Sequence, residues 1–200
     1  MHKADLQRII FMTGVIIMQL TDQEQYQNKI RRVMISEQEI RDAIQKAGAE
    51  IDKEYAGKPL LLVSILKGAF VFLADLSRAV SIPCEIGFMQ AQSYFEGTTS
   101  SGKVEITLDL TQDISHYHVL IVEDIIDTGR TLKLVMEELR KRNPLSLKII
   151  TLLDKPSRRV VEITADKTLF TIPDAFVIGY GLDCAEYYRN LPYIAEYAEQ

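Results

Sequence analysis

Short apolar runs that alternate with longer amphipathic segments constrain the fold of this chain more than any other feature. The strings "LLLVSIL" (60–66), "VLIVEDI" (119–125) and "LKIITLLDK" (147–155) are too apolar for strands with one wet face. Strands buried on both faces are typical of parallel sheets that helices cover on both sides. Alternating strands and helices predict the α/β class. The sequence therefore predicts a twisted, mostly parallel sheet flanked by helices.

The helices of this pattern have recognisable ends. Ser36 and Glu39 form an S-x-x-E capping box, and Gly57 and Pro59 stop the segment that follows. Further helices are expected in "AFVFLADLSRAV" (69–80) and "TLKLVMEELRKRN" (131–143), and further strands in "CEIGFMQAQSY" (84–94), "VEITLDL" (104–110) and "AFVIGYGLD" (175–183). The apolar face of the first helix would consist of Ile40, Ile44, Ala47, Ile51 and Tyr55.

Length and composition exclude several classes of protein. The 200 residues suit one domain, 47% of them are hydrophobic and 26% are charged, so disorder is not expected. The net charge of −5 disfavours nonspecific binding to nucleic acid or to an anionic membrane. Two cysteines, Cys84 and Cys184, without a CxxC motif or clustered histidines, argue against a disulfide framework or a zinc site. A reducing cytoplasm fits best.

The N-terminal segment stands apart from the rest. An apolar run at 9–18 is too short to span a bilayer, and no small-residue cleavage site follows it, although Lys3 and Arg8 precede it. We expect residues 1–20 to be an extension, either a packed tail or the product of an upstream start before Met18. Residues 21–200 would form the single domain.

Four predicted strands end in chemically unusual residues. These are Lys67-Gly68, Glu123-Asp124, Asp154-Lys155, and the segment from Tyr180 to Asp183. In open parallel sheets the ligand lies at the carboxyl ends of the strands, where the loops gather. A polar stretch rich in Gly and Ser, "SYFEGTTSSGK" (93–103), is the best candidate for a mobile loop beside such a site.

The turn after Asp127 has the composition of a phosphate cradle. A helix N-terminus offers unpaired N–H groups and a partial positive charge. Gly129 permits close approach, Thr128 and Thr131 add hydroxyl donors, and Arg130 either adds charge or points into water. The segment lacks the GxxxxGK[ST] pattern of NTP-binding loops.

Acids directly before this turn indicate a sugar. Glu123 and Asp124 are suited to hold a polyol, or a sugar with its Mg²⁺, and Asp127 is placed to take a proton. The inferred ligand is a phosphorylated sugar. An acid pair after a strand is, taken alone, more often a solvated loop. The D-T-G string also occurs in aspartic proteases, but those need two copies of the motif and mostly short strands.

The segment "VLIVEDIIDTGRTL" (119–132) resembles the phosphoribosyl-pyrophosphate (PRPP) binding motif of type I phosphoribosyltransferases. "LLVSILKGAFVFLADL", "LLDKPSRR" and "IPDAFVIGYGLDCAEYYRNLPYI" resemble the hypoxanthine-guanine phosphoribosyltransferase subfamily over residues 35–194. The resemblance implies purine salvage: PRPP, with Mg²⁺, and a 6-oxopurine give the nucleoside 5′-monophosphate and pyrophosphate. It also implies a small hood over the active site, built from the N-terminal part and the C-terminal segment.

The resemblance assigns roles to individual residues. Glu123 and Asp124 would bind the ribose hydroxyls and Mg²⁺, with Asp183 as a further metal ligand. Asp127 would be the base facing purine N7. Lys67 and Gly68, joined by a cis peptide, and Arg189 would bind pyrophosphate. The remaining roles are the 5′-phosphate cradle of Thr128, Gly129, Arg130 and Thr131, the purine contacts of Lys155, Phe176 and Val177, and the start of the mobile loop at Ser93 and Tyr94.

Some alternatives stay open at this point. Taken alone, Lys67 is a solvated turn residue, Arg189 a surface residue and Phe176 a core aromatic. Cys184 stands where the family commonly has an aromatic residue, and "ITADKTLFTIP" departs from the usual approach to the purine site. A non-catalytic PRPP-sensing regulator would need a basic face, which the charge disfavours. Lys155 argues against adenine as substrate, whereas xanthine remains open. The resemblance suggests a homodimer or homotetramer.

Overall fold

The computed structural model describes residues 29–94 and 103–198. Within them, the larger sheet has the order β4-β3-β2-β5-β6-β7. Strands β2, β3, β5, β6 and β7 run parallel, and only the edge strand β4 pairs antiparallel with β3. The predicted α/β fold with a mostly parallel sheet is confirmed. The bounds of these strands are β2 Leu60–Leu66, β3 Cys84–Tyr94, β4 Lys103–Leu108, β5 His118–Ile126, β6 Ser146–Asp154 and β7 Lys167–Thr171.

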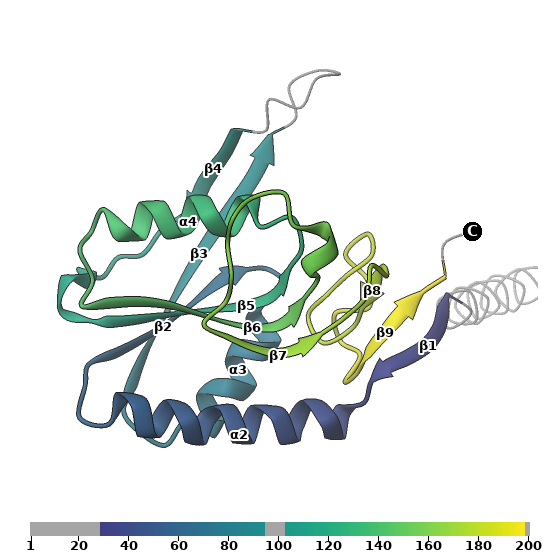
Figure 1. Ribbon diagram of the computed structural model, residues 1–200, viewed down its shortest axis with the longest axis horizontal. Helices are drawn as coiled ribbons and strands as arrows, with labels where there is room; N and C mark the ends of the chain where they lie inside the picture. Colours follow the sequence, from purple (N-terminus) through teal and green to yellow (C-terminus); the bar gives the residue numbers. More distant parts are fainter. Residues whose placement is uncertain (1–28, 95–102, 199–200) are drawn as a thin grey trace, which may run out of the picture.

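Helices cover both faces of this sheet (Figure 1). Helices α2 (Glu37–Tyr55) and α3 (Phe70–Ala79) lie on one face and α4 (Arg130–Arg140) on the other. Side chains of β2 alternate between the two cores: Leu62 packs with α2 and α3, and Val63 packs with α4. This is why the strands read as unbroken apolar runs. The short 3₁₀ helices η1 (Ile114–His116) and η2 (Pro156–Arg158) complete the connections.

Helix α2 forms as its sequence signals predict. Ser36 Oγ accepts a hydrogen bond from Glu39 N at 3.3 Å, while the Glu39 carboxylate accepts from Ser36 N at 2.8 Å. This reciprocal capping box satisfies backbone donors that the first helical turn leaves open. The predicted apolar face is buried in full: Ile40, Ile44, Ala47, Ile51 and Tyr55.

A second, smaller antiparallel sheet was not predicted. It has the order β1-β9-β8, from β1 (Ile30–Ile35), β9 (Ile194–Tyr197) and β8 (Val177–Ile178). Ile30 pairs with Tyr197, so the sheet joins the start and the end of the described chain. It lies beside the larger sheet, beyond the carboxyl ends of its strands (Figure 1).

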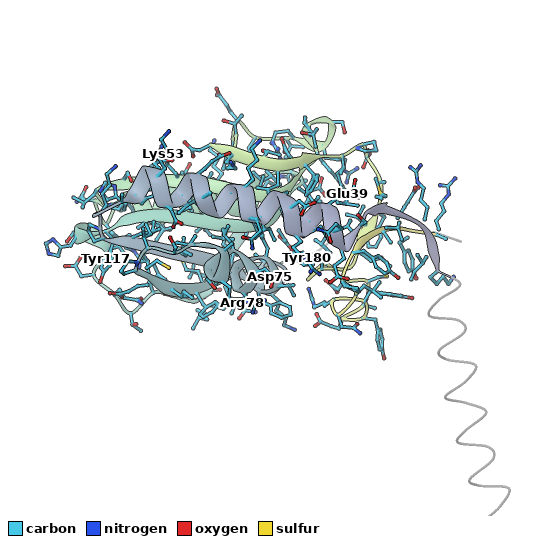
Figure 2. All side chains as sticks on the ribbon, turned by 90° about the horizontal axis from the view of Figure 1, so that it is seen from below. Glu39, Lys53, Asp75, Arg78, Tyr117 and Tyr180 are labelled. Atoms are coloured by element: carbon cyan, nitrogen blue, oxygen red, sulfur yellow. The ribbon has the colours of Figure 1, made fainter. Side chains whose placement is uncertain are left out.

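The loop between β8 and β9 (179–193) is hydrogen-bonded to α3. The buried Tyr180 donates its hydroxyl to Asp75, and Asp75 is also paired with Arg78. Figure 2 labels these three side chains near one another, below α2 in that view. Burial, and then the neighbouring Asp75 carboxylate, raise the pKa of Tyr180. The hydrogen bond from Tyr180 to Asp75 therefore fixes the start of the loop that carries Asp183 and Arg189.

Candidate active site

The carboxyl end of β5 presents two acids to the interior. Glu123 is 9% exposed, and among the described residues its Oε2 has no hydrogen-bond partner. Asp124 accepts one hydrogen bond, at 2.8 Å from the Ile125 N–H. Burial raises the pKa values of both carboxyl groups, and the Asp124 charge raises that of Glu123 further. Two adjacent acids held in this way cost stability and call for a ligand that bonds to them.

The turn that the sequence predicts to hold phosphate leads directly into α4. Gly129 has φ +80° and caps α4, and a Cβ there would overlap the Ile163 side chain, so both conformation and space require glycine. The α4 N-terminus follows directly, with Arg130 exposed and Thr131 half-buried. Thr128 Oγ accepts from Arg130 N at 3.5 Å. The first N–H groups of a helix have no intrahelical partner, so this turn suits an oxyanion.

Asp127, Lys155 and Phe176 line one cavity of about 760 Å³. Strand pairing brings two of them together, because Ile126 lies opposite Asp154 and the Lys155 N–H donates to Ile126 O at 3.0 Å. Lys155 is 6% exposed and Phe176 is 43% exposed. The Phe176 ring meets the Tyr197 ring edge-on at 5.6 Å. A cavity with an exposed aromatic, a buried amine and a carboxylate suits a flat, polar heterocycle.

The Val177 side chain does not contribute to the lining of this cavity. It is buried and pairs with Glu196 in the small sheet. The Phe176 carbonyl accepts from the Tyr197 N–H at 2.8 Å, which fixes the strand that carries the aromatic ring. The purine contacts predicted for Phe176 and Val177 thus depend on the unpredicted β8–β9 pairing.

The loop after β2 packs against the acid pair. A Cβ at Gly68 would overlap the Asp124 carboxylate, and one at Gly181 would overlap the Gly68 carbonyl. Glycine is required at both positions by close approach. The cis peptide of this loop joins Leu66 to Lys67, so the expectation of a cis bond between Lys67 and Gly68 is wrong by one peptide. The bond lies at the end of β2 itself rather than inside the turn.

The two predicted pyrophosphate-binding cations share one partner. Lys67 Nζ lies 2.8 Å from Glu186 Oε2, and Arg189 Nη2 lies 3.2 Å from Glu186 Oε1. Arg189 Nη2 also lies 2.9 Å from Asp183 Oδ1, and Nη1 donates to the Gly181 carbonyl at 2.8 Å. The Arg189 Nε is buried without a hydrogen-bond partner among the described residues. Sequence reasoning placed Lys67, Asp183 and Arg189 in the site but missed Glu186.

Arginines after Lys155 were also missed. Arg158 Nε lies 3.3 Å from Asp127 Oδ1, and Arg159 binds both the Asp127 carbonyl and the Asp154 carboxylate. The string "DKPSRR" contained both residues. A basic residue in a short loop has no pattern that distinguishes a site contact from a solvated charge, so only the fold could find them.

Two predicted features are described only in part. Ser93 and Tyr94 end β3 and pair with Val104 and Lys103. Most of the predicted mobile loop (93–103), like the N-terminal extension (1–20), lies outside the described residues. Across the described ranges, no helix has the length and apolar character needed to cross a membrane.

Comparisons with known proteins agree with this geometry. Residues 28–185 match the model of the phosphoribosyl transferase domain. A hypoxanthine-guanine phosphoribosyltransferase of Streptococcus pneumoniae is 53% identical over 174 residues, which cover 87% of this chain and 97% of that protein. The crystal structure of a hypoxanthine phosphoribosyltransferase from Staphylococcus aureus superposes with a TM-score of 0.83 at 46% identity, covering 86% of this chain and 94% of that one.

A more distant relative has the same fold. The solved structure of a hypoxanthine phosphoribosyltransferase from Trypanosoma cruzi has a TM-score of 0.81 at 41% identity, and covers 86% of this chain and 97% of that one. The chain belongs to the phosphoribosyl transferase family and, within it, to the hypoxanthine-guanine phosphoribosyltransferases.

Proposed function

We propose that the chain transfers the 5-phosphoribosyl group of PRPP to hypoxanthine, guanine or both, giving IMP or GMP and pyrophosphate. The observation that carries this proposal is the convergence at one sheet edge of an acid pair, a phosphate cradle and an aromatic-lined cavity. Each part suits one portion of the reacting pair: ribose, 5′-phosphate and purine. The relatives at about 50% identity bear the name of this activity.

Different groups of residues in the site would bind different parts of PRPP. Thr128, Gly129, Arg130 and Thr131 would hold the 5′-phosphate at the positive end of α4. Glu123 and Asp124 would accept hydrogen bonds from the ribose hydroxyls, which gives the unpartnered Glu123 Oε2 its partner. Lys67, Gly68 and Arg189 would receive the pyrophosphate group. The phosphate cradle and the acid pair would thus bind opposite ends of one phosphoribosyl group.

Bond making and breaking would occur at C1 of the ribose. The bond from C1 to the pyrophosphate oxygen breaks, and a bond from C1 to purine N9 forms. Positive charge that develops on the ribose is favoured by the nearby carboxylates of Glu123 and Asp124. Lys67 and Arg189 stabilise the negative charge that grows on pyrophosphate. Asp127 accepts the proton that the purine loses at N7.

The donor set fits a magnesium ion shared with substrate. Among the described residues, no cluster of three or more His, Cys, Asp or Glu side chains could hold a metal alone. Mg²⁺ is usually bound by one or two carboxylates together with water and substrate oxygens. Glu123, Asp124 and Asp183 would supply such carboxylates. When bound, the ion would neutralise charge on the pyrophosphate.

Purine selection would rest on Lys155. Its buried amine is a donor, which suits the O6 acceptor of a 6-oxopurine and opposes the amino group of adenine. Phe176 would stack on the base, and backbone groups of Val177 would meet its polar edge. The small sheet β1-β9-β8, whose strand β8 contains Val177 and directly follows Phe176 in the chain, would act as the hood, with Ser93 and Tyr94 opening the mobile loop. Residues 21–200 would form the single domain, with 1–20 outside it.

Conversion of a panel of bases tests the proposed activity. The purified chain is mixed with PRPP, Mg²⁺ and hypoxanthine, guanine, xanthine or adenine, and nucleotide formation is measured. We expect rapid conversion of hypoxanthine or guanine and none of adenine. Binding of PRPP without product from any base would indicate a PRPP-sensing regulator instead, and conversion of xanthine alone would change the substrate. We also propose that the chain is cytoplasmic and that it forms a homodimer or homotetramer. Sedimentation would measure the oligomeric state.

A further inference from the structure

Glu186 lies between two cations that come from distant parts of the chain. Its two carboxylate oxygens reach Lys67 Nζ at 2.8 Å and Arg189 Nη2 at 3.2 Å. Lys67 and Glu186 are separated by 119 residues. Both cations have been placed in the pyrophosphate subsite above. A carboxylate that spans them occupies the place of the anion they would bind.

A tight turn aims this carboxylate at the cations. Cys184 and Tyr187 exchange backbone hydrogen bonds of 3.2 and 3.1 Å, and the Glu186 N–H donates to Asp183 Oδ2 at 2.9 Å. Ala185 and Glu186 have φ values of +52° and +70°. Left-handed backbone at two consecutive non-glycine residues is uncommon, and such conformations cluster at functional sites.

Exposure makes the contact easy to break. The side chains of Lys67 and Glu186 are 55% and 65% exposed. Ion pairs of this exposure add little to stability, since solvent competes for both charges. Arg189 differs, because its side chain is 18% exposed and keeps Asp183 and the Gly181 carbonyl as partners. Loss of Glu186 from the cluster would therefore leave Arg189 in position.

We propose that Glu186 is an internal competitor of the pyrophosphate group: its carboxylate covers Lys67 and Arg189 in the free protein and leaves when the multiply charged ligand binds. This inference rests on the proposed function and adds a regulatory residue to the same site. The exchange swaps one carboxylate for a more highly charged anion on the same two cations. Glu186 thereby lowers the affinity for PRPP and hastens release of pyrophosphate.

Direct binding of inorganic pyrophosphate tests the proposal. Isothermal titration calorimetry in Mg²⁺ buffer compares the full chain with its Glu186→Gln variant, which keeps the shape of the side chain and removes the charge. We expect binding to become about threefold to fivefold tighter, the amount by which an exposed ion pair competes. The KM for PRPP would fall by a similar factor.

Glu54→Gln is the matched control, because Glu54 forms a comparable exposed pair with Lys148 at 2.5 Å, away from the site residues described above. Its pyrophosphate affinity should equal that of the wild type. Unchanged or weaker binding by Glu186→Gln, with turnover retained, would overturn the competitor role alone. Absence of both pyrophosphate binding and turnover in the wild type would instead overturn the proposed function, and this proposal with it.

Discussion

The two charged regions of the site hold their charges in opposite ways. At the end of β5, Glu123 and Asp124 are adjacent, withdrawn from water and without a cationic partner in hydrogen-bond contact within the described residues. Around Lys67 and Arg189, every charge meets an opposite one within 3.2 Å. Burial of the two acids costs stability, which a bound ligand would offset. The charges of the basic region are already paired, so a ligand would have to displace one partner.

Asp127 directly follows β5, the strand that carries the acid pair, and should give the largest effect. Asp127→Asn keeps the size of the side chain but cannot accept the purine proton. We expect kcat to fall by about 10²–10⁴-fold, as general-base loss typically does, while PRPP affinity stays near that of the wild type. Steady-state kinetics and PRPP titration measure the two quantities. An unchanged kcat would remove Asp127 from the chemistry.

Lys155 is a third case. It is buried and, among the described residues, forms no ion pair with a carboxylate within 4 Å. Lys155→Ala removes the donor proposed for O6. A hydrogen bond from a charged group contributes about 1.5–3 kcal/mol, so kcat/KM for hypoxanthine should fall about 10- to 100-fold. Binding of adenine, which offers no O6 acceptor and is not expected to react, should not weaken in parallel. An equal loss for every base would show that Lys155 supports the cavity rather than selects the base.

The destabilisation that comes from burying the acid pair can be measured as a change in the free energy of unfolding. Burial raises the pKa of Asp124 to about 6. A carboxyl group whose pKa is raised by folding stabilises the fold while protonated, and that contribution is lost as pH rises from about 4 through about 6. Asp124→Asn should therefore increase the free energy of unfolding at pH 7 by about 1–3 kcal/mol, and by little below pH 4.

Denaturant unfolding at pH 3.5 and pH 7 measures this difference. Asp109→Asn is a suitable control, because Arg142 lowers the pKa of Asp109 and the variant should lose stability at pH 7. PRPP affinity should decrease in Asp124→Asn although the protein is more stable. A less stable Asp124→Asn variant at pH 7 would contradict the contrast between the two regions.

The smallest effect is expected at Arg158. Its pair with Asp127 at 3.3 Å is about half exposed on both sides, and such pairs contribute about 0.2–1 kcal/mol. Arg158→Ala should lower kcat/KM by less than about fivefold. Arg142→Ala, which removes a pair with Asp109, should leave it unchanged. A loss near that of Asp127→Asn would make Arg158 part of the proton transfer.

The larger sheet was predictable because its signals are local. Apolar runs gave β2, β5 and β6, and the capping box at Ser36 gave the start of α2. The small sheet was not predictable in the same way. Its strand β8 has two residues, and β1 carries the exposed Arg31 and Arg32, which hide any alternation. Its pairing joins residues far apart in the chain, and no local pattern reports that.

The residues of the candidate site show the same difference between local sequence signals and contacts that form only on folding. Glu123 lies at the end of one strand, and Asp127 and Gly129 follow it in an unusual string, so their chemistry could be inferred from sequence. The pyrophosphate-binding roles of Lys67 and Arg189 came from the resemblance alone. Glu186 and Arg158 are ordinary charged loop residues, and their contacts arise only when the chain folds. Position in space, rather than residue type, gives them their partners.

Phosphorus NMR of the complete reaction tests the central claim most directly. The chain, PRPP, Mg²⁺ and hypoxanthine are incubated together, and a parallel sample omits the base. The account predicts equal amounts of nucleoside 5′-monophosphate and inorganic pyrophosphate, formed only when hypoxanthine is present. Release of pyrophosphate with ribose 5-phosphate in both samples, or PRPP that persists in both, would contradict transfer to hypoxanthine, and the same outcome with guanine in its place would contradict transfer to a purine.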